Sequence, residues 1–362
     1  MPINNTKLAN PLNYRNPTLI GLGASAVLTA LVIVGSRNLE HFDSALFGYL
    51  IASIVAFGAI FFRYALWLQR PATRAYFLRG LKLFFQRKKF ARNTIDATKT
   101  VGINMLGQKF IFKRARSRWL MHFLIMWGCI LSAAITFPLV WGWIHFKLEG
   151  DRTYRAYLFG FPMQEMDVYS LIAWFTFKAL NFTALMVLAG CAIAIHRRLK
   201  DRGAIAVQQF LLDFVPHLLL IAICVSGLML TASSTYFGGY MYSFIALTHQ
   251  AIVIMTLFFL PFGKLFHIVQ RPASIGVELY QQRAKEMEQA KCLRCGVEFA
   301  SVMWLGDLKS VVEKVGFDYT MENGEKLQDY CPRCKRVMRG LAYSVLMDRP
   351  DKVFHGSRTD GK

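Results

Sequence analysis

Long apolar runs alternate with short polar segments along the chain as far as Pro272. Each run is about 18 residues or longer, the length that an α-helix needs to cross the hydrocarbon core of a bilayer. The first run lacks the basic start and small-residue cleavage site of a signal peptide, so it counts as a span. The pattern therefore predicts an all-α polytopic membrane protein built on a six-helix transmembrane bundle. The predicted spans cover residues 17–36, 45–68, 119–146, 168–195, 210–235 and 244–268.

Basic residues are distributed unevenly between these spans. The chain carries 43 Lys and Arg against 22 Asp and Glu, and the loop 69–118 holds 14 of the cations with a single acid, Asp96. Such a bias marks the cytoplasmic side of a membrane, so topology accounts for the charge without nucleic-acid binding. We expect a protein of the cell inner (cytoplasmic) membrane with both termini cytosolic. The segments expected inside are the N-terminus, 69–118, 197–208 and the C-terminal tail, and those expected outside are 37–44, 147–167 and 236–243.

Composition divides the chain into five regions. Residues 74–90 (RAYFLRGLKLFFQRKKF) interleave cations with Phe, Leu and Tyr, which is typical of an amphipathic helix on an anionic membrane surface. A docking surface for a soluble partner is the competing interpretation. After Pro272 the sequence becomes charged and mixed, as in a small cytosolic domain. The regions are two N-terminal helices (1–68), the basic loop (69–118), a four-helix bundle (119–272), a cytosolic four-cysteine domain (285–350) and a flexible tail (351–362).

Three histidines at the predicted spans are candidates for a buried site, because an imidazole in lipid needs a partner. His249 and His267 are 18 residues apart. In one continuous helix both would lie on the same face, with a difference in depth of about 27 Å, so they suit two sites at different depths. His122, near the start of the third span, lies at the depth of His267. Paired imidazoles from facing helices hold a b-type haem, although hydrogen bonds to backbone or headgroups are the alternative explanation.

Other residues near His122 and His267 fit the haem interpretation. Gly128 and Gly263 would let a porphyrin edge approach, because neither has a side chain. The cations at the inner boundary that would pair with haem propionates are Arg116, Arg118, Lys264 and Arg271.

The stretches WLMHFLIMWG and LFFLPFGKLFHIVQRP lie in a region, about residues 115–275, that resembles a family of membrane cytochromes. The family includes the cytochrome b (gamma) subunit of respiratory nitrate reductase and the membrane cytochromes of heterodisulfide-reductase-like and sulfite-reductase-associated complexes. In that family the last helix supplies one histidine to each of two haems, and an earlier helix supplies the other two ligands. The resemblance implies a quinone substrate and cytosolic iron–sulfur or molybdenum partner subunits.

Carried over by position, the resemblance implies that His122 and His267 bind the inner haem. The second ligand position of the earlier helix is Ser132 here, and a serine does not replace an imidazole as a strong iron ligand. His249 is therefore an outer ligand with another partner, or the outer haem is absent. The other histidines considered as its partner, both poorly placed, are His145 and His217. One haem b is expected, and a second is left open.

Lys178 and Asn181 interrupt the fourth predicted span. A lysine at such depth costs about 2.5–3.5 kcal/mol unless it is paired or solvated. A quinone oxygen would be a suitable partner for Lys178. Snorkelling to the interface or an ion pair with Asp167 is the simpler explanation, and we favour it.

Four cysteines after the spans form two C-x-x-C pairs, CLRC and CPRC. Two such pairs supply four thiolates, which is the tetrahedral sulfur set of zinc or of a mononuclear iron. A [2Fe–2S] cluster fits this spacing less well, and disulfides are disfavoured in a cytosolic domain. The predicted ligands are Cys292, Cys295, Cys331 and Cys334, whereas the cysteines expected only to pack within the spans are Cys129, Cys191 and Cys224.

These patterns predict a membrane-anchoring cytochrome b subunit that passes electrons between quinone and a cytosolic oxidoreductase partner. Such a chain would be the quinone-linked subunit of a larger oxidoreductase rather than an enzyme alone. The alternative is a transporter or a non-redox membrane module with a zinc-ribbon tail. No inverted repeat is evident, which counts against a transporter.

Overall fold

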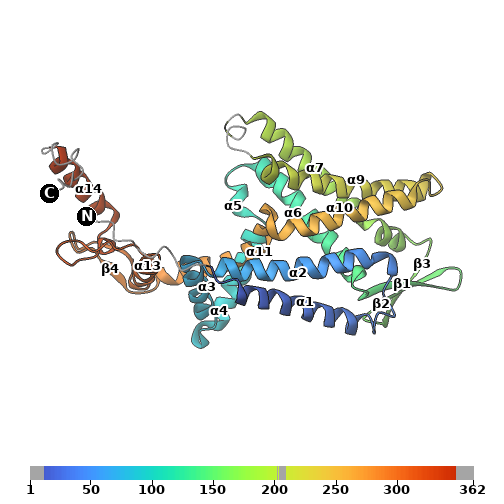
Figure 1. The fold of residues 1–362 in the computed structure, drawn as a ribbon, viewed down its shortest axis with the longest axis horizontal. Coiled ribbons are helices and arrows are strands. Elements are labelled where there is room, and N and C mark those ends of the chain that lie inside the picture. Colours follow the sequence, from blue (N-terminus) through green and yellow to red (C-terminus); the bar gives the residue numbers. More distant parts are fainter. Residues whose placement is uncertain (1–11, 202, 204–208, 348–362) are drawn as a thin grey trace, which may run out of the picture. The chain divides into compact units, whose positions relative to one another are not determined.

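The computed structural model describes residues 12–201, 203 and 209–347, so the predicted tail 351–362 lies outside the described residues. The chain divides into two compact units. The bundle unit comprises residues 13–67 and 98–274, and the cysteine unit comprises residues 68–97 and 275–347. Both units are mostly helical (Figure 1).

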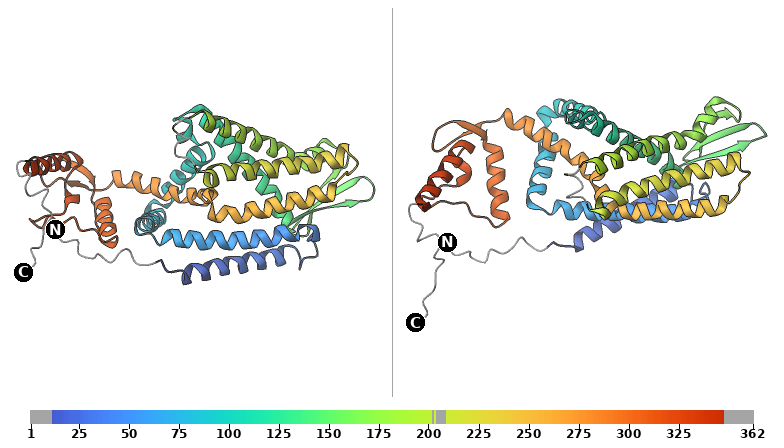
Figure 2. Two further views of the ribbon diagram at one scale, coloured as in Figure 1. Left: turned by 45° about the horizontal axis from the view of Figure 1, so that its top comes forward. Right: turned by 90° about the horizontal axis from the view of Figure 1, so that it is seen from above.

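Six helices of the described chain are long and apolar enough to cross a membrane, which confirms the predicted fold class. Large apolar side chains such as Leu22, Phe175 and Phe244 are exposed on these helices, as lipid contact requires. Neighbours along the chain form antiparallel hairpins, seen for α1 with α2 and for α9 with α10 (Figure 2). The six helices are α1 (Arg15–Gly35), α2 (Phe47–Leu68), α6 (Arg116–Val140), α7 (Leu171–Lys200), α9 (Val215–Tyr236) and α10 (Tyr242–Phe262).

Small residues bring the helices of the bundle unit close together. A Cβ atom added at Gly128 of α6 would lie 2.6 Å from Val187 of α7, and one added at Gly190 of α7 would lie 2.6 Å from Ile125 of α6. Reciprocal glycines of this kind allow close backbone approach between membrane helices. The expectation that Gly128 makes room for a porphyrin is therefore wrong, because its open side is filled by α7. Gly263 likewise faces the Phe259 ring, 2.3 Å from its added Cβ.

The last span is not one continuous helix, contrary to the prediction for 244–268. Helix α10 ends at Phe262, Gly263 is extended with ψ −171°, and a 3₁₀ turn (η5, Lys264–Phe266) leads into the short helix α11 (His267–Gln270). Pro261 has no N–H to donate and Gly263 leaves the helical conformation, so the hydrogen-bond ladder stops here. The expected common face for His249 and His267 consequently does not exist.

The loop expected at 147–167 is a three-stranded antiparallel sheet of order β1-β2-β3. Its sequence alternates apolar and polar residues, and Gly150 and Gly160 adopt positive φ angles at the two turns. Helix α6 ends at Val140, so His145 lies in β1 rather than in the third span. The strands are β1 (Ile144–Glu149), β2 (Thr153–Leu158) and β3 (Phe161–Asp167).

Short helical segments complete both units. In the bundle unit they are η1 (Ser44–Leu46), η3 (Val101–Leu106), α5 (Lys109–Phe112), η4 (Phe210–Phe214) and η6 (Arg271–Ala273). The cysteine unit contains α3 (Pro71–Phe84), η2 (Arg87–Lys89), most of α4 (Phe90–Thr100), α12 (Ser274–Lys285), β4 (Gln289–Lys291), β5 (Glu298–Ser301), α13 (Val302–Lys314), η7 (Leu327–Asp329) and α14 (Pro332–Met347).

Helix α3 lies within the stretch expected to form an amphipathic surface helix, and part of its apolar face packs inside the cysteine unit. Leu83 is 2 % exposed and packs with Leu279 and Tyr280 of α12. Gly80 allows this approach, since a Cβ there would lie 3.0 Å from Gly276. Helix α3 therefore packs on α12 of the same chain. Phe85, directly after the end of α3, is exposed.

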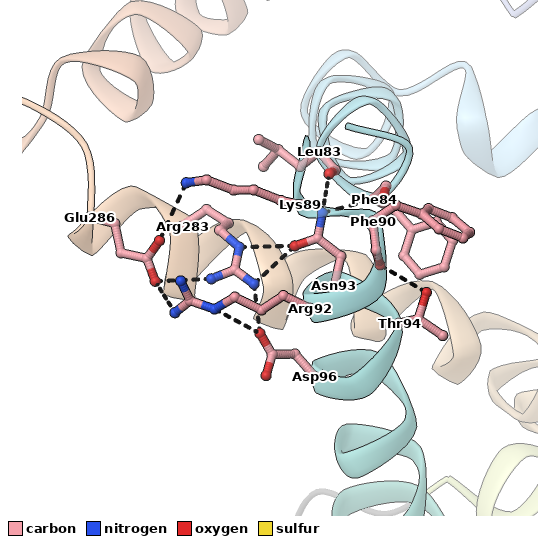
Figure 3. Close-up of polar contacts among 10 residues, drawn as sticks. All are labelled: Leu83, Phe84, Lys89, Phe90, Arg92, Asn93, Thr94, Asp96, Arg283 and Glu286. Atoms are coloured by element: carbon pink, nitrogen blue, oxygen red, sulfur yellow. Dashed lines mark hydrogen bonds and ion pairs between the residues drawn. The ribbon is translucent and has the colours of Figure 1, made fainter. Parts of the chain in front are cut away.

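A buried guanidinium joins α12 to α4 (Figure 3). Arg283 is 2 % exposed and donates to Asn93 Oδ1 at 2.9 and 3.0 Å, to Asp96 at 2.6 Å and to Glu286 at 2.9 Å. Asn93, fully buried, in turn donates to the carbonyl oxygen of Leu83 at 2.7 Å. Because a buried cation without partners is strongly disfavoured, this network fixes the position of α4 against α12.

Replacing Arg283 with methionine should lower the free energy of opening the α4–α12 contact by about 2–4 kcal/mol, since Asn93, Asp96 and Glu286 lose their shared donor. Hydrogen-exchange mass spectrometry of residues 275–285 in the full-length protein measures this. Arg92→Met is the matched control, because the Arg92 side chain on the rim of the same network is 59 % exposed and its loss should cost less than about 1 kcal/mol. Equal effects of the two substitutions would contradict the account.

Candidate functional site: a histidine pair and a four-cysteine cluster

The structure brings His122 and His267 together within the bundle unit. His122 projects from α6 and His267 begins α11, and their ring centres are 6.5 Å apart with ring planes at 61°. Two imidazoles that bind one metal ion through bonds of about 2 Å have ring centres about 6 Å apart. The pair therefore has the separation of two axial ligands.

Each ring uses its Nδ1 in a hydrogen bond. His122 Nδ1 lies 3.0 Å from Gln108 Oε1, and His267 Nδ1 lies 2.6 Å from the carbonyl oxygen of Lys264. Both acceptors are oxygens, so each Nδ1 donates, and in the neutral ring this leaves the Nε2 lone pair to bind a metal. This is the tautomer of a metal-binding histidine oriented by a second group. The donor set thus fits an iron porphyrin held by two imidazoles.

Gln108 was not identified from the sequence. It is 1 % exposed, adopts φ +52° directly before α5, and its side-chain amide also contacts the Met126 sulfur. A non-glycine residue in the left-handed region is uncommon, and the contacts of the Gln108 amide with His122 and Met126 offset the backbone strain. No local sequence pattern predicts the contact between Gln108 and His122, because it depends on how the segment before α6 folds back.

Lys264 is held by an ion pair rather than left free for a propionate. Its Nζ lies 2.7 Å from Asp213 Oδ1, and Arg198 Nη1 lies 3.3 Å from the same oxygen. Asp213 is 9 % exposed and also accepts from the backbone N–H of Gln209. The carboxylate therefore anchors the η5 turn whose carbonyl orients His267. In the sequence this contact could have been suspected from Asp213 itself, a lone acid in the apolar stretch LLDFVPH.

The outer ligand candidate, His249, has a serine and not a histidine as its partner. His249 Nδ1 lies 2.9 Å from Ser226 Oγ of α9. His217 Nδ1 lies 2.8 Å from the carbonyl oxygen of Asp213 instead. Ser132 donates to Thr183 at 2.7 Å.

His145 also pairs elsewhere, with its ring stacked between His41 and Tyr157 at centroid distances of 4.2 and 4.8 Å. Burial and the neighbouring His41 ring, together with Lys147 and Arg37, lower the pKa of His145. Neither His145 nor His217 is thus placed beside His249 as a second iron ligand.

Lys178 forms a hydrogen bond near one end of α7. Its Nζ donates to Thr235 Oγ1 of α9 at 3.2 Å. Asp167 pairs with Arg152 at 3.3 Å, so the alternative of a Lys178–Asp167 ion pair is not the arrangement formed. The neighbouring Asn181 accepts from Thr231 at 3.0 Å. These contacts satisfy the polar groups of α7 within the protein.

The four cysteines of the C-x-x-C pairs converge in the cysteine unit. Their sulfur atoms all lie within 4.8 Å of one another, and the Sγ atoms of Cys295 and Cys331 are 3.8 Å apart. Tetrahedral coordination with metal–sulfur bonds of about 2.3 Å gives sulfur–sulfur distances of about 3.8 Å. The cluster therefore has the dimensions of a four-thiolate metal site. Cys292, Cys331 and Cys334 are buried, whereas Cys295 is exposed.

Local structure explains why the two pairs meet. The first pair lies in the turn of the β4–β5 hairpin, and the second lies at the start of α14. The backbone N–H of Cys331 donates to Cys292 Sγ at 3.2 Å, and that of Cys334 donates to Cys331 Sγ at 3.4 Å. Burial opposes ionisation of Cys292, but donors from Cys331, Cys295 and Arg294 outweigh it and lower its pKa to about 6. Hydrogen bonds from Cys334 lower the pKa of Cys331 too.

Comparison with protein families, with curated proteins and with solved structures finds no match for this chain. Functional inference therefore depends on the histidine pair and the cysteine cluster themselves.

One zinc or non-haem iron ion per chain is expected in the purified full-length protein, and Cys331→Ala should remove most of it because three thiolates leave the tetrahedral site open. Elemental analysis measures the content and distinguishes zinc from iron, once any haem iron, measured by a haem assay, is subtracted. Cys191→Ala, at a fully buried thiol of α7, serves as the control and should keep the ion. A metal-free parent protein, or equal metal content in the two variants, would contradict the assignment.

Proposed function

We propose that this chain is the membrane-anchoring cytochrome b subunit of a redox complex, in which one b-type haem is held by His122 and His267. The 6.5 Å separation of the two rings supports this proposal, because the rings come from separate elements and each uses Nδ1 for its hydrogen bond to the protein. When bound, the haem would supply a one-electron carrier within the bundle. Quinone is the proposed membrane substrate, in keeping with the cytochrome family that the sequence resembles.

The protein's own residues would orient the two ligands. Gln108 fixes the His122 tautomer, and Asp213 holds Lys264 so that its carbonyl oxygen accepts a hydrogen bond from His267 Nδ1. Such outer partners typically change metal affinity by about 10–100-fold when they are removed. A single haem is proposed, because Ser226 is the partner found for His249. Lys178 is a weaker candidate for quinone contact, since its ammonium group already donates a hydrogen bond to Thr235.

We further propose that both termini and the cysteine unit face the cytosol of a cell inner membrane. The excess of Lys and Arg in residues 69–118 supports this orientation. A cytosolic iron–sulfur or molybdenum oxidoreductase would then exchange electrons with this side. The four-cysteine site would hold zinc as a structural ion or a mononuclear iron as a further redox centre.

A transporter is the second candidate, and the interruption of the last span at Gly263 is the observation that favours it. Broken helices create substrate sites in many transporters, but there the break lies near the middle of the membrane. Here the break follows the last residue of α10, Phe262, and it places His267 beside His122. The redox proposal explains this placement directly.

The full-length protein produced with haem available should show the reduced-minus-oxidised absorption bands of a b-type haem. His122→Ala and His267→Ala should each reduce haem content at least about tenfold, because one imidazole is lost from a two-ligand site. Optical difference spectroscopy with a haem assay measures this.

His196→Ala is the matched control, since this histidine lies near the C-terminal end of α7 and has no part in the His122–His267 pair. It should leave the spectrum unchanged. A folded parent protein without haem bands would rule out the proposal and favour the transporter.

A further inference from the structure

Charge is segregated within the cysteine unit around the metal site. The two knuckle segments, residues 291–297 and 331–340, contain cations and no acid. Their cations are Lys291, Arg294, Arg333, Lys335, Arg336 and Arg339. The intervening segment 298–330 is acidic, with Glu298, Asp307, Glu313, Asp318, Glu322, Glu325 and Asp329 against Lys309, Lys314 and Lys326. The unit thus has a basic end at its cysteines.

The cations of the knuckle segments take part in no ion pair with another described residue. Among the described residues none of the six forms an ion pair, whereas Lys309 pairs with Asp329 at 2.6 Å and Lys326 pairs with Glu313. Arg294 and Arg333 are exposed, and each directly precedes a cysteine of the cluster, Cys295 or Cys334. Each C-x-x-C pair therefore carries an arginine at the same position, next to a metal ligand.

Compensation of the metal site does not account for this charge. Four thiolates with a divalent ion leave roughly two net negative charges, fewer than the six cations of the knuckle segments. The excess remains positive and exposed. Arg294 directly precedes Cys295, the one exposed cysteine of the cluster, whose neighbours along the chain, Leu293 and Val297, are 55 % and 59 % exposed. An apolar centre with a charged rim is the usual composition of a protein-binding surface.

We propose that the knuckle segments 291–297 and 331–340 form the docking surface for an acidic redox protein, which binds over Cys295. This inference deepens the proposed function, because it names the surface used by the redox partner. Charge complementarity favours an acidic protein and speeds its encounter with the metal site. A lipid surface suits the geometry less well, because the cations do not follow one helix face. Lys291 and Arg294 lie at the end of β4 and in the turn that follows it, and the other four lie in α14.

Binding of an acidic two-iron ferredoxin to the full-length, metal-loaded protein in neutral phosphatidylcholine nanodiscs tests this. Arg294→Glu and Arg333→Glu should each raise the dissociation constant about tenfold at an ionic strength of about 0.01 M. The increase should be smaller at about 0.15 M, because salt screens the attraction. Arg294→Lys and Arg333→Lys should retain binding. Lys314→Glu is the matched control, an equal charge change at the exposed end of α13, and it should have little effect.

Absence of ferredoxin binding by the parent, or an equal loss in Lys314→Glu, overturns the proposal. Protection of the knuckle segments from hydrogen exchange in phosphatidylserine nanodiscs, without ferredoxin binding, would assign them to lipid instead. Metal content of each variant verifies that the site is intact. The haem spectrum of the same samples separates the two proposals. If the parent protein contains haem but does not bind ferredoxin, only the docking proposal is contradicted. If it binds ferredoxin but contains no haem, only the cytochrome proposal is contradicted.

Discussion

An imidazole has two nitrogen atoms, and inside an apolar helical bundle each of them needs a partner. The contacts of His122 and His267 follow from this constraint. In both rings Nδ1 is satisfied by an oxygen of the protein, from the Gln108 side chain and the Lys264 backbone, and the two ring centres lie 6.5 Å apart. The helix break at Gly263 and the ion pair of Lys264 with Asp213 have the same structural effect, because both determine where the His267 ring lies.

The same rule organises the cysteine unit with different groups. Arg283 is buried only because Asn93, Asp96 and Glu286 surround its guanidinium. Backbone N–H donors of Cys331 and Cys334 favour the ionised forms of Cys292 and Cys331, and the ionised thiol is the form that binds metal.

Much of the architecture could be predicted from the sequence, because the signals are long or chemically specific. Six apolar runs sufficed for six spans, and two C-x-x-C pairs sufficed for the cysteine cluster. The helix break was missed although Pro261 and Gly263 are visible, because a long apolar run was given more weight than its breakers. The β1–β3 sheet was missed for a similar reason. Its alternating residues lie between two spans and were treated as a loop.

Contacts between distant segments were beyond sequence reasoning. Gln108 reaches His122 only through a left-handed backbone conformation. Electron paramagnetic resonance of the oxidised full-length protein tests the central claim most directly, because it reports how many strong ligands the iron has. Two imidazole ligands predict a low-spin ferric signal from one haem per chain. A high-spin signal, or no haem signal from folded protein, would contradict the pairing of His122 with His267.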